Sequence, residues 1–170
     1  MKPLAGFSAV ARDDAEILIL GSMPGAKSLQ QQQYYAHPQN SFWYIMQKIF
    51  NVTEIENYQQ RLELLQKNRI ALWDVLQQCI RPGSLDSAIK SGSVIANNFM
   101  DFFQFNKQIR CVFFNGARAE QEYRKLVLPD VVQIYPEINY KRLPSTSPAM
   151  ATMNREQKLA VWGEAIKIPC

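Results

Sequence analysis

The sequence has little of the chemistry on which metalloproteins and disulfide-rich proteins depend. Its 170 residues include only three cysteines, Cys79, Cys111 and Cys170, and these form no C-x-x-C pair. An odd number of widely spaced cysteines argues against a disulfide framework and against a thiolate zinc site, and three thiolates are too few for an ordinary iron–sulfur cluster. Because His37 is the only histidine, almost all ligands of a catalytic zinc would have to be carboxylates. We therefore expect no metal and no cofactor.

Long apolar runs are also missing. No uninterrupted apolar stretch approaches the length of a membrane span, and the mixed segment Met1–Arg12 lacks the charged-then-apolar pattern of an export signal. We therefore expect a cytoplasmic protein without a membrane partner. The length fits one domain over residues 1–170, and 47% hydrophobic with 20% charged residues is ordinary for a globular chain. A net charge of +4 is compatible with a polyanionic partner but is not specific to one.

Apolar segments alternate with amphipathic ones along the chain. The predicted strands are Glu16–Leu20, Arg69–Leu76, Ile109–Phe114 and Asn139–Leu143. The predicted helices are 42–49 behind an Asn40 N-cap, 53–68 opened by a Thr53–Glu56 capping box, 95–103, 117–128 and a last helix capped by Asn154 and Gln157. This order predicts an α/β fold, a three-layer α/β/α sandwich around a mainly parallel four-stranded sheet.

Ligands of such sheets bind beyond the carboxyl ends of the strands. We therefore look for the site in the loops after Leu20, Asp74, Phe114 and Leu143, and Arg81–Ser84 opens a further loop of the kind that carries function. The first loop, Gly21-Ser22-Met23-Pro24-Gly25, lets backbone amides approach a ligand closely. It lacks the spacing of a dinucleotide-binding or P-loop motif. A plain structural turn is the alternative interpretation.

Two further segments are rich in unusual residues. They are Tyr34-Tyr35-Ala36-His37-Pro38-Gln39-Asn40-Ser41-Phe42-Trp43 and Leu143-Pro144-Ser145-Thr146-Ser147-Pro148-Ala149. Together with the first glycine loop and Ser28-Leu29, they resemble the motif set of the hypoxanthine-DNA glycosylases, a branch of the uracil-DNA glycosylase superfamily. The mismatch-specific uracil-DNA glycosylases have a similar G-x-N-P-G loop and H-P-x-N-x-F-W segment. The resemblance covers nearly the whole chain and implies a uracil-DNA glycosylase-like fold.

One departure from the mismatch-specific branch bears on catalysis. In that branch an asparagine of the first glycine loop helps to activate water, whereas this sequence has Met23, which can neither orient water nor accept a proton. In the hypoxanthine branch the asparagine of the H-P-x-N segment is implicated instead, and here that residue is Asn40. A neutral amide can orient water but is no strong base, so we expect modest turnover. A helix N-cap is the alternative role for Asn40, and both roles can coexist.

The resemblance also suggests how the base and the DNA are held. Tyr35 takes the position of an aromatic ring that stacks on the extruded base, although a tyrosine there could belong to the core. Asp74 ends a strand and could contact the base edge or serve only as a cap. His37 is a weaker candidate for a general base. The last loop offers hydroxyls and amides for phosphates and an apolar wedge for the emptied stack, unless it is an ordinary turn; its residues are Ser145, Thr146, Ser147, Pro148, Ala149 and Met150.

We therefore predict a monomeric, monofunctional DNA glycosylase of base excision repair. It would flip a deaminated base, hypoxanthine first, out of DNA and hydrolyse its N-glycosidic bond to leave an abasic site. A uracil or mismatch-specific glycosylase is the main enzymatic rival. Two hypotheses from different classes also stay open: a non-catalytic protein that binds damaged DNA, and a hydrolase of small molecules.

Overall fold

Four parallel strands form the central sheet of the protein. The computed structural model describes residues 1–170, and the strand order in this sheet is β3-β2-β6-β7 with every neighbouring pair parallel. The strands are β2 (Ile17–Gly21), β3 (Ile70–Asp74), β6 (Cys111–Asn115) and β7 (Asn139–Leu143). The two central strands are buried along their whole length, as expected for a sheet covered on both faces. The predicted parallel four-stranded sheet is confirmed.

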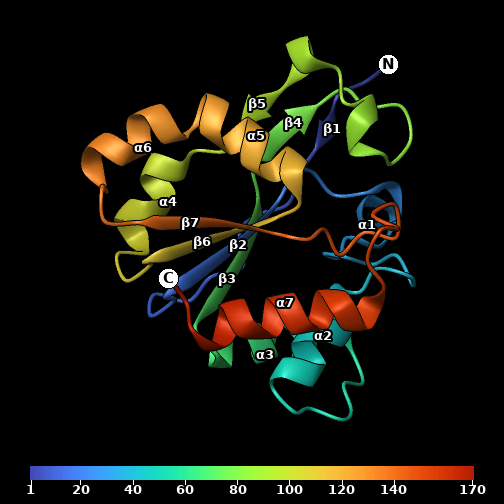
Figure 1. Cartoon of the computed structure of the whole chain (residues 1–170). Helices are drawn as coiled ribbons and strands as arrows, with labels where there is room; N and C mark the ends of the chain where they lie inside the picture. Colours follow the sequence, from blue (N-terminus) through green and yellow to red (C-terminus); the bar gives the residue numbers. More distant parts are fainter.

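Helices cover both faces of this sheet (Figure 1). One layer contains α4 (Phe99–Phe105), α5 (Ala117–Leu126) and α6 (Leu128–Ile134), and the other contains α2 (Phe42–Ile49), α3 (Tyr58–Lys67) and α7 (Arg155–Lys167). Alternate residues of β2 enter different cores: Leu18 and Leu20 pack under the first layer, whereas Ile17 and Ile19 pack under the second. The predicted three-layer sandwich is confirmed.

A second, smaller sheet was not predicted. It has the antiparallel order β1-β4-β5, with β1 (Leu4–Ala5), β4 (Leu76–Cys79) and β5 (Ile95–Ala96). The prediction of one strand over Arg69–Leu76 is therefore wrong, because the chain leaves the parallel sheet after Asp74 and pairs with the N-terminal segment instead. Apolar periodicity alone does not show that a strand changes partner.

Several helix ends also differ from the prediction. Helix α3 begins only at Tyr58, because the side chain of Asn57 accepts a hydrogen bond from the Gln60 backbone N–H at 3.0 Å, so the Thr53–Glu56 capping box is wrong. The predicted helix 117–128 is two helices, α5 and α6. Pro129 lies in the first turn of α6, where a missing N–H has no cost. The capping box at the start of α7 is confirmed, with both of its hydrogen bonds at 2.9 Å.

The segment between β4 and α4 is more irregular than predicted. Ile95, predicted to start a helix, lies in β5, and α4 begins at Phe99 behind an Asn98 cap. Short 3-10 helices follow β4, η1 (Asp86–Ala88) and η2 (Ser91–Ser93). Helix α1 (Ala26–Gln31) follows the first glycine loop.

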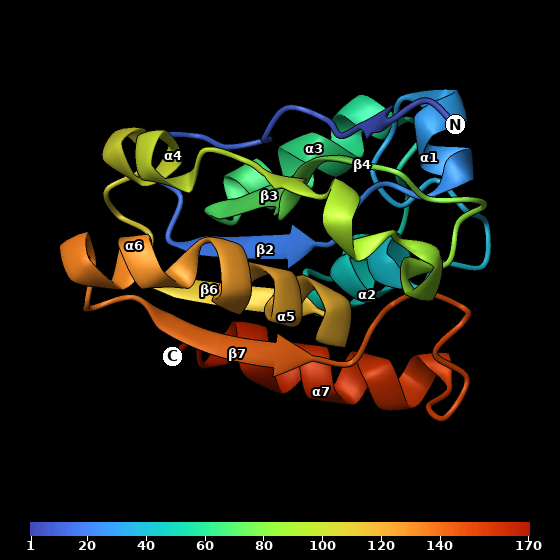
Figure 2. The same cartoon turned by 90° about the horizontal axis from the view of Figure 1, so that it is seen from above.

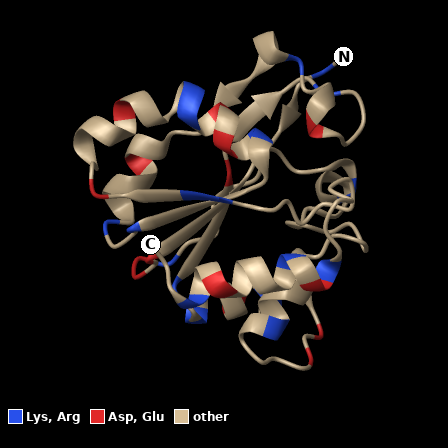
Figure 3. Ribbon diagram, in the orientation of Figure 1, with Lys and Arg blue, Asp and Glu red and all other residues tan.

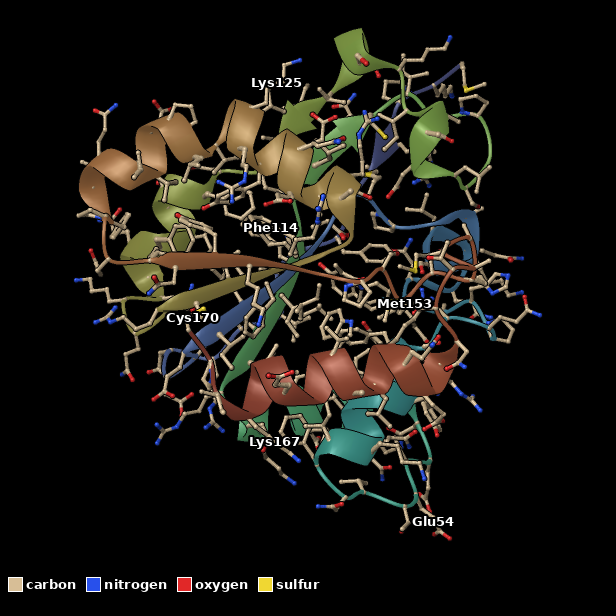
Figure 4. All side chains as sticks on the ribbon, viewed as in Figure 1. Glu54, Phe114, Lys125, Met153, Lys167 and Cys170 are labelled. Carbon is tan, nitrogen blue, oxygen red and sulfur yellow. A yellow bond between two sulfur atoms is a disulfide. The ribbon has the colours of Figure 1, made fainter.

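Two cysteines pair, contrary to expectation. Cys111 of β6 and Cys170 form a disulfide with their Cα atoms 5.8 Å apart, whereas Cys79 is buried and free. Figure 4 shows Cys170 beside the sheet, where the chain returns after α7. The two cysteines lie 59 positions apart in the sequence, so no local pattern predicted this contact. No three His, Cys, Asp or Glu side chains gather as a possible metal site, and no helix has the length and apolarity to cross a bilayer.

Candidate functional site

A cavity of about 590 Å³ opens beyond the carboxyl ends of the parallel strands. This volume is in the range of roughly 300–1,000 Å³ usual for ligand pockets. Figure 2 shows α1 at the same end of the sheet, toward which the strand arrows point. The cavity brings together all of the predicted site residues and His37. Its walls come from six parts of the chain: 21–28, 34–40, Asp74, 84–87, 115–118 and 145–150.

Asn40 lies half-buried in the wall of the cavity, ahead of helix α2. Its Oδ1 accepts a hydrogen bond from the backbone N–H of Phe42 at 2.9 Å, so the side chain caps the first turn of the helix. No hydrogen bond uses its Nδ2, and Oδ1 keeps a second lone pair. The amide can therefore donate to and accept from a water molecule while it caps the helix.

Asp74 and Gly21 lie side by side at the ends of β3 and β2, paired in register. Asp74 is only 3% exposed, and neither the backbone nor any side chain donates a hydrogen bond to its Oδ2. A Cβ at Gly21 would overlap Asp74 Oδ1 and come within 3.1 Å of the hydroxyl of Tyr35. Glycine at position 21 is thus what lets both polar groups approach the floor of the cavity.

The Asp74 carboxyl is held in an environment that disfavours its charge. Burial raises the pKa of Asp74 to about 7, and the nearby Asp86 carboxylate adds to the rise while Arg81 opposes it. The group therefore changes its protonation state near neutral pH, which is unusual for a carboxyl outside a functional site.

Tyr35 contributes both a ring and a hydroxyl to the cavity. Its ring stacks on Phe42, with centroids 4.2 Å apart and planes 28° from parallel. The backbone of Tyr35 has a φ of +52°, a left-handed conformation that costs free energy for a non-glycine residue. Its hydroxyl is completely buried beside the Asn115 side chain, and burial raises its pKa. The neighbouring Trp43 indole N–H, which donates to the Tyr34 carbonyl at 2.9 Å, helps to hold this backbone.

The segment after β4 clamps the first glycine loop. The side chain of Arg81 is fully buried and donates to the carbonyls of Pro24 and Gly83. From the other side, the Ser22 hydroxyl donates to Asp86 at 2.7 Å. The sequence marked this loop as functional through its Arg-Pro-Gly-Ser start, but nothing in the sequence singled out Asp86.

Asn115 is a site residue that the sequence prediction missed. It ends β6, and its side chain holds Thr146 twice: Nδ2 donates to Thr146 Oγ1 and Oδ1 accepts from the Thr146 backbone N–H, both at 2.9 Å. Thr146 is 0% exposed. It therefore joins the last loop to the sheet instead of facing DNA, which differs from the prediction. The available signal was the Asn115-Gly116 pair at a strand end.

The loop after β7, residues 144–150, is anchored to helix α7 at its start and exposed at its tip. The Trp162 indole N–H donates to the Pro144 carbonyl at 2.9 Å, and the Lys158 ammonium donates to the Ser147 carbonyl at 3.0 Å. Lys158 is 3% exposed, and burial lowers its pKa. Pro148 and Ala149 are exposed at the tip, near the end of α7 where Figure 4 labels Met153.

His37 has no free lone pair for base catalysis. Its Nδ1 accepts a hydrogen bond from the Gln39 backbone N–H at 3.2 Å, which places the proton of the neutral ring on Nε2. The ring is exposed at the mouth of the cavity and offers a donor there. This geometry argues against His37 as the general base.

Residues of both charges occur on the helices of both layers (Figure 3). Cations near the cavity are Lys27 and Arg118, which line it. Arg118 is paired with Glu122 at 2.7 Å, so part of its charge is neutralised. Hydroxyls and backbone amides of the loops must then provide much of any contact with a phosphate.

Comparison with known proteins adds an independent line of evidence. The family model of the Uracil DNA glycosylase superfamily matches residues 7–166. A protein of Methanosarcina barkeri named Hypoxanthine DNA glycosylase is 40% identical over 115 residues, 67% of this chain and 72% of the relative. A protein of the same name from Methanosarcina acetivorans is 40% identical over 124 residues, 72% of this chain and 76% of the relative.

A solved structure is similar over the whole chain. It is the solution NMR structure of a Methanosarcina acetivorans protein with the provisional name uracil DNA glycosylase. The TM-score is 0.77 at 32% identity, over 98% of this chain and 100% of the other.

Proposed function

Because this chain belongs to the uracil DNA glycosylase superfamily, we propose that it is a monofunctional DNA glycosylase that removes hypoxanthine from DNA. Two relatives at 40% identity carry the name Hypoxanthine DNA glycosylase, which supports this choice of base. The observation that carries the proposal is the cavity at the sheet edge, with Asn40 in its wall and the Asn40 Nδ2 free of hydrogen bonds within the protein.

The proposed reaction is a hydrolysis. The bond between the sugar C1′ and the base nitrogen breaks, and its electron pair leaves with the base. Water forms the new bond to C1′ and gives up a proton, and the departing base takes up a proton from solvent, so the products are an abasic site and the free base. The sugar passes through an oxocarbenium-like state, as in other glycoside hydrolyses. Asn40 would orient the water through Oδ1 and Nδ2.

The other predicted residues would hold the substrate. The cavity face of the Tyr35 ring would stack on the extruded base, an interaction worth roughly 1–3 kcal/mol. The first glycine loop, Gly21 to Gly25, would line the base pocket, and Asp74 would meet the base edge. The exposed tip, Pro148 and Ala149 with Met150 beside it, would fill the gap in the stack, while Ser145 and Ser147 contact phosphates. The enzyme would act as a monomer in the cytoplasm, with DNA as its partner.

A release assay tests this proposal. Duplexes that carry one deoxyinosine or one deoxyuridine are incubated with the protein, and free base and abasic sites are measured. We expect release of hypoxanthine, and we expect Asn40→Ala to lower the rate roughly 10²- to 10⁴-fold, the usual effect of a group that handles the proton or water in the transition state. Gln39→Ala, a change at the exposed neighbour, serves as the matched control.

Three outcomes would contradict parts of the proposal. Unchanged activity in a folded Asn40→Ala protein would remove Asn40 from catalysis. Because this variant also loses a helix cap, worth about 1 kcal/mol, its folding is checked by thermal denaturation. Release of uracil alone would change the substrate, and tight binding of the deoxyinosine duplex without any release would favour a non-catalytic sensor.

A further inference from the structure

We infer that Asp74 is the residue that separates hypoxanthine from adenine, because its ionised carboxylate accepts the ring N–H of hypoxanthine but repels the bare ring nitrogen of adenine. The inference rests on the proposed function. It concerns the class of base that the cavity admits: bases with a ring N–H beside a carbonyl.

The structure leaves the Asp74 carboxyl without an internal role. It forms no side-chain hydrogen bond within the protein, and its Oδ2 is completely buried. The Asn97 side chain donates to the backbone carbonyl of Asp74 at 2.8 Å and leaves the carboxyl free. A buried carboxyl without a partner costs free energy, and this one lines the cavity. A ligand that donates a hydrogen bond to Oδ1, the carboxyl oxygen beside Gly21 that is not enclosed, would compensate part of that cost.

The floor around it favours an edge-on contact with a planar ring. Gly21 has no side chain to fill the space beside Asp74, and the enclosed Tyr35 hydroxyl lies beside the same position. Tyr35 lines the same cavity. A planar base that enters beside Gly21 would direct an edge toward Asp74 Oδ1, the oxygen next to Gly21.

The two purines differ at this edge. Hypoxanthine carries N1–H beside the C6 carbonyl, whereas adenine carries an unprotonated N1 beside an amino group. A protonated carboxyl can pair with either base, because it has one donor and one acceptor. An ionised carboxylate has acceptors only, so it pairs with N1–H of hypoxanthine and faces the lone pair of adenine N1. When Asp74 loses its proton, it therefore can no longer pair with adenine but still pairs with hypoxanthine.

The surroundings of Asp74 make its carboxyl lose its proton near neutral pH. Asp86 of η1 raises its pKa, Arg81 of the clamp opposes this, and burial is the largest cause of a value of about 7. The remaining titratable groups that interact with it are the hydroxyls of Tyr34, Tyr35 and Tyr58, whose own pKa values are raised by burial. These hydroxyls stay neutral near pH 7, so Asp74 is the group that changes charge there.

Binding to oligonucleotides that cannot be cleaved tests the inference. The probes contain 2′-fluoro-deoxyinosine or 2′-fluoro-deoxyadenosine, each opposite an abasic site so that neither base must break a pair. Dissociation constants are measured by fluorescence anisotropy between about pH 6 and about pH 8. The preference for the inosine probe should rise roughly tenfold over this range, since the protonated fraction of a group with a pKa of about 7 falls by that factor.

Asp74→Asn is the informative variant, because an amide has a donor and an acceptor at every pH. We expect it to bind both probes with a pH-independent ratio. Asp101→Asn, at an exposed helix position far from the cavity, should behave as the wild type. A flat preference in the wild type overturns the inference whether or not the variant folds, and so does a wild-type pH dependence that persists in Asp74→Asn.

A parallel release assay on ordinary deoxyinosine duplex separates this inference from the proposed function. Release of hypoxanthine with a pH-independent probe preference overturns the role of Asp74 alone. A pH-dependent preference without release overturns the catalytic proposal and retains Asp74 as the selecting residue.

Discussion

At the scale of the residue, Gly21 shows how a missing side chain shapes the site. The change Gly21→Ala would force its new Cβ against Asp74 Oδ1 and close to the Tyr35 hydroxyl. Because Asp74 Oδ1 would overlap the new Cβ, the carboxyl must turn away, and we expect a loss of roughly 1–3 kcal/mol of stability, as for other overpacked sites. Base release should fall more than tenfold at a temperature where the variant is folded, roughly the cost of displacing a positioning group.

The control for this change is Gly92→Ala, since a Cβ there meets no atom within 4 Å. Thermal denaturation and base release are measured on both variants. Full activity of Gly21→Ala would show that Asp74 and Tyr35 need not occupy their observed positions.

The raised pKa of Asp74 should also make the stability of the protein depend on pH. Its pKa is raised to about 7 from a model-peptide value of 3.8, so the folded state binds this proton more tightly than the unfolded state. The stabilisation is therefore complete below about pH 4 and is lost as pH rises toward about 7. Asp74→Asn lacks this loss. Its free energy of unfolding relative to the wild type should increase by on the order of 3 kcal/mol between about pH 4 and about pH 8.

Urea denaturation at several pH values measures this difference, with Asp101→Asn again as the control. A relative stability of Asp74→Asn that does not change with pH would mean that the carboxyl has an ordinary pKa in the folded protein.

At the scale of the element, helix α7 acts as a support for the last loop. The change Lys158→Met keeps the apolar stem and removes the ammonium that holds the Ser147 carbonyl. Since the loop tip would lose one of its anchors, we expect weaker insertion into DNA. The KM for deoxyinosine duplex should rise roughly tenfold, about 1.4 kcal/mol, with a smaller effect on kcat.

Lys158→Arg should recover part of the lost affinity, because it restores a donor at this position. Leu159→Met, a change at the next residue of the same helix, is the control for helix stability. A loss of kcat with unchanged KM in Lys158→Met would argue against a role in holding the loop.

The elements also show what sequence patterns can and cannot predict. The strands with continuous apolar runs, such as Ile17–Leu20, were predicted because burial on both faces leaves a local signal. The turn from β3 into β4 was missed because the change of sheet depends on pairing with Leu4 and Ala5, distant in sequence. The helix cap at Asn57 was missed because the Thr53 pattern matched a capping box equally well.

The site shows the same division. Asn40 and Tyr35 were predicted because their segment resembles a motif of the hypoxanthine-DNA glycosylases, and the two loops because they follow strands of the sheet and belong to the same motif set. Asn115 and Asp86 were not, because their roles arise from contacts with Thr146 and Ser22 that only the folded chain brings about. Residues that act through long-range hydrogen bonds leave no local pattern.

At the scale of the whole molecule, the site loops gather at one edge of the sheet, and the opposite edge is free of them (Figure 2). The body of the sandwich therefore serves to hold these loops in a fixed relation to one another. Because only Lys27 and Arg118 line the cavity as cations, and Arg118 is paired with Glu122, DNA contact there should involve few charges and its electrostatic part should be modest in size.

The salt dependence of DNA binding measures that electrostatic part. If the cavity edge neutralises three or four phosphates, the logarithm of the affinity should fall linearly with the logarithm of salt concentration, with a slope of roughly −3. Affinity for a deoxyinosine duplex would then drop roughly 40- to 150-fold from about 50 mM to about 200 mM salt. Lys27→Ala removes one exposed cation at the cavity, so it should reduce the slope by about 1 if that lysine meets a phosphate. An affinity independent of salt, together with hydrolysis of free inosine, would identify a hydrolase of small molecules instead of an enzyme that reads DNA.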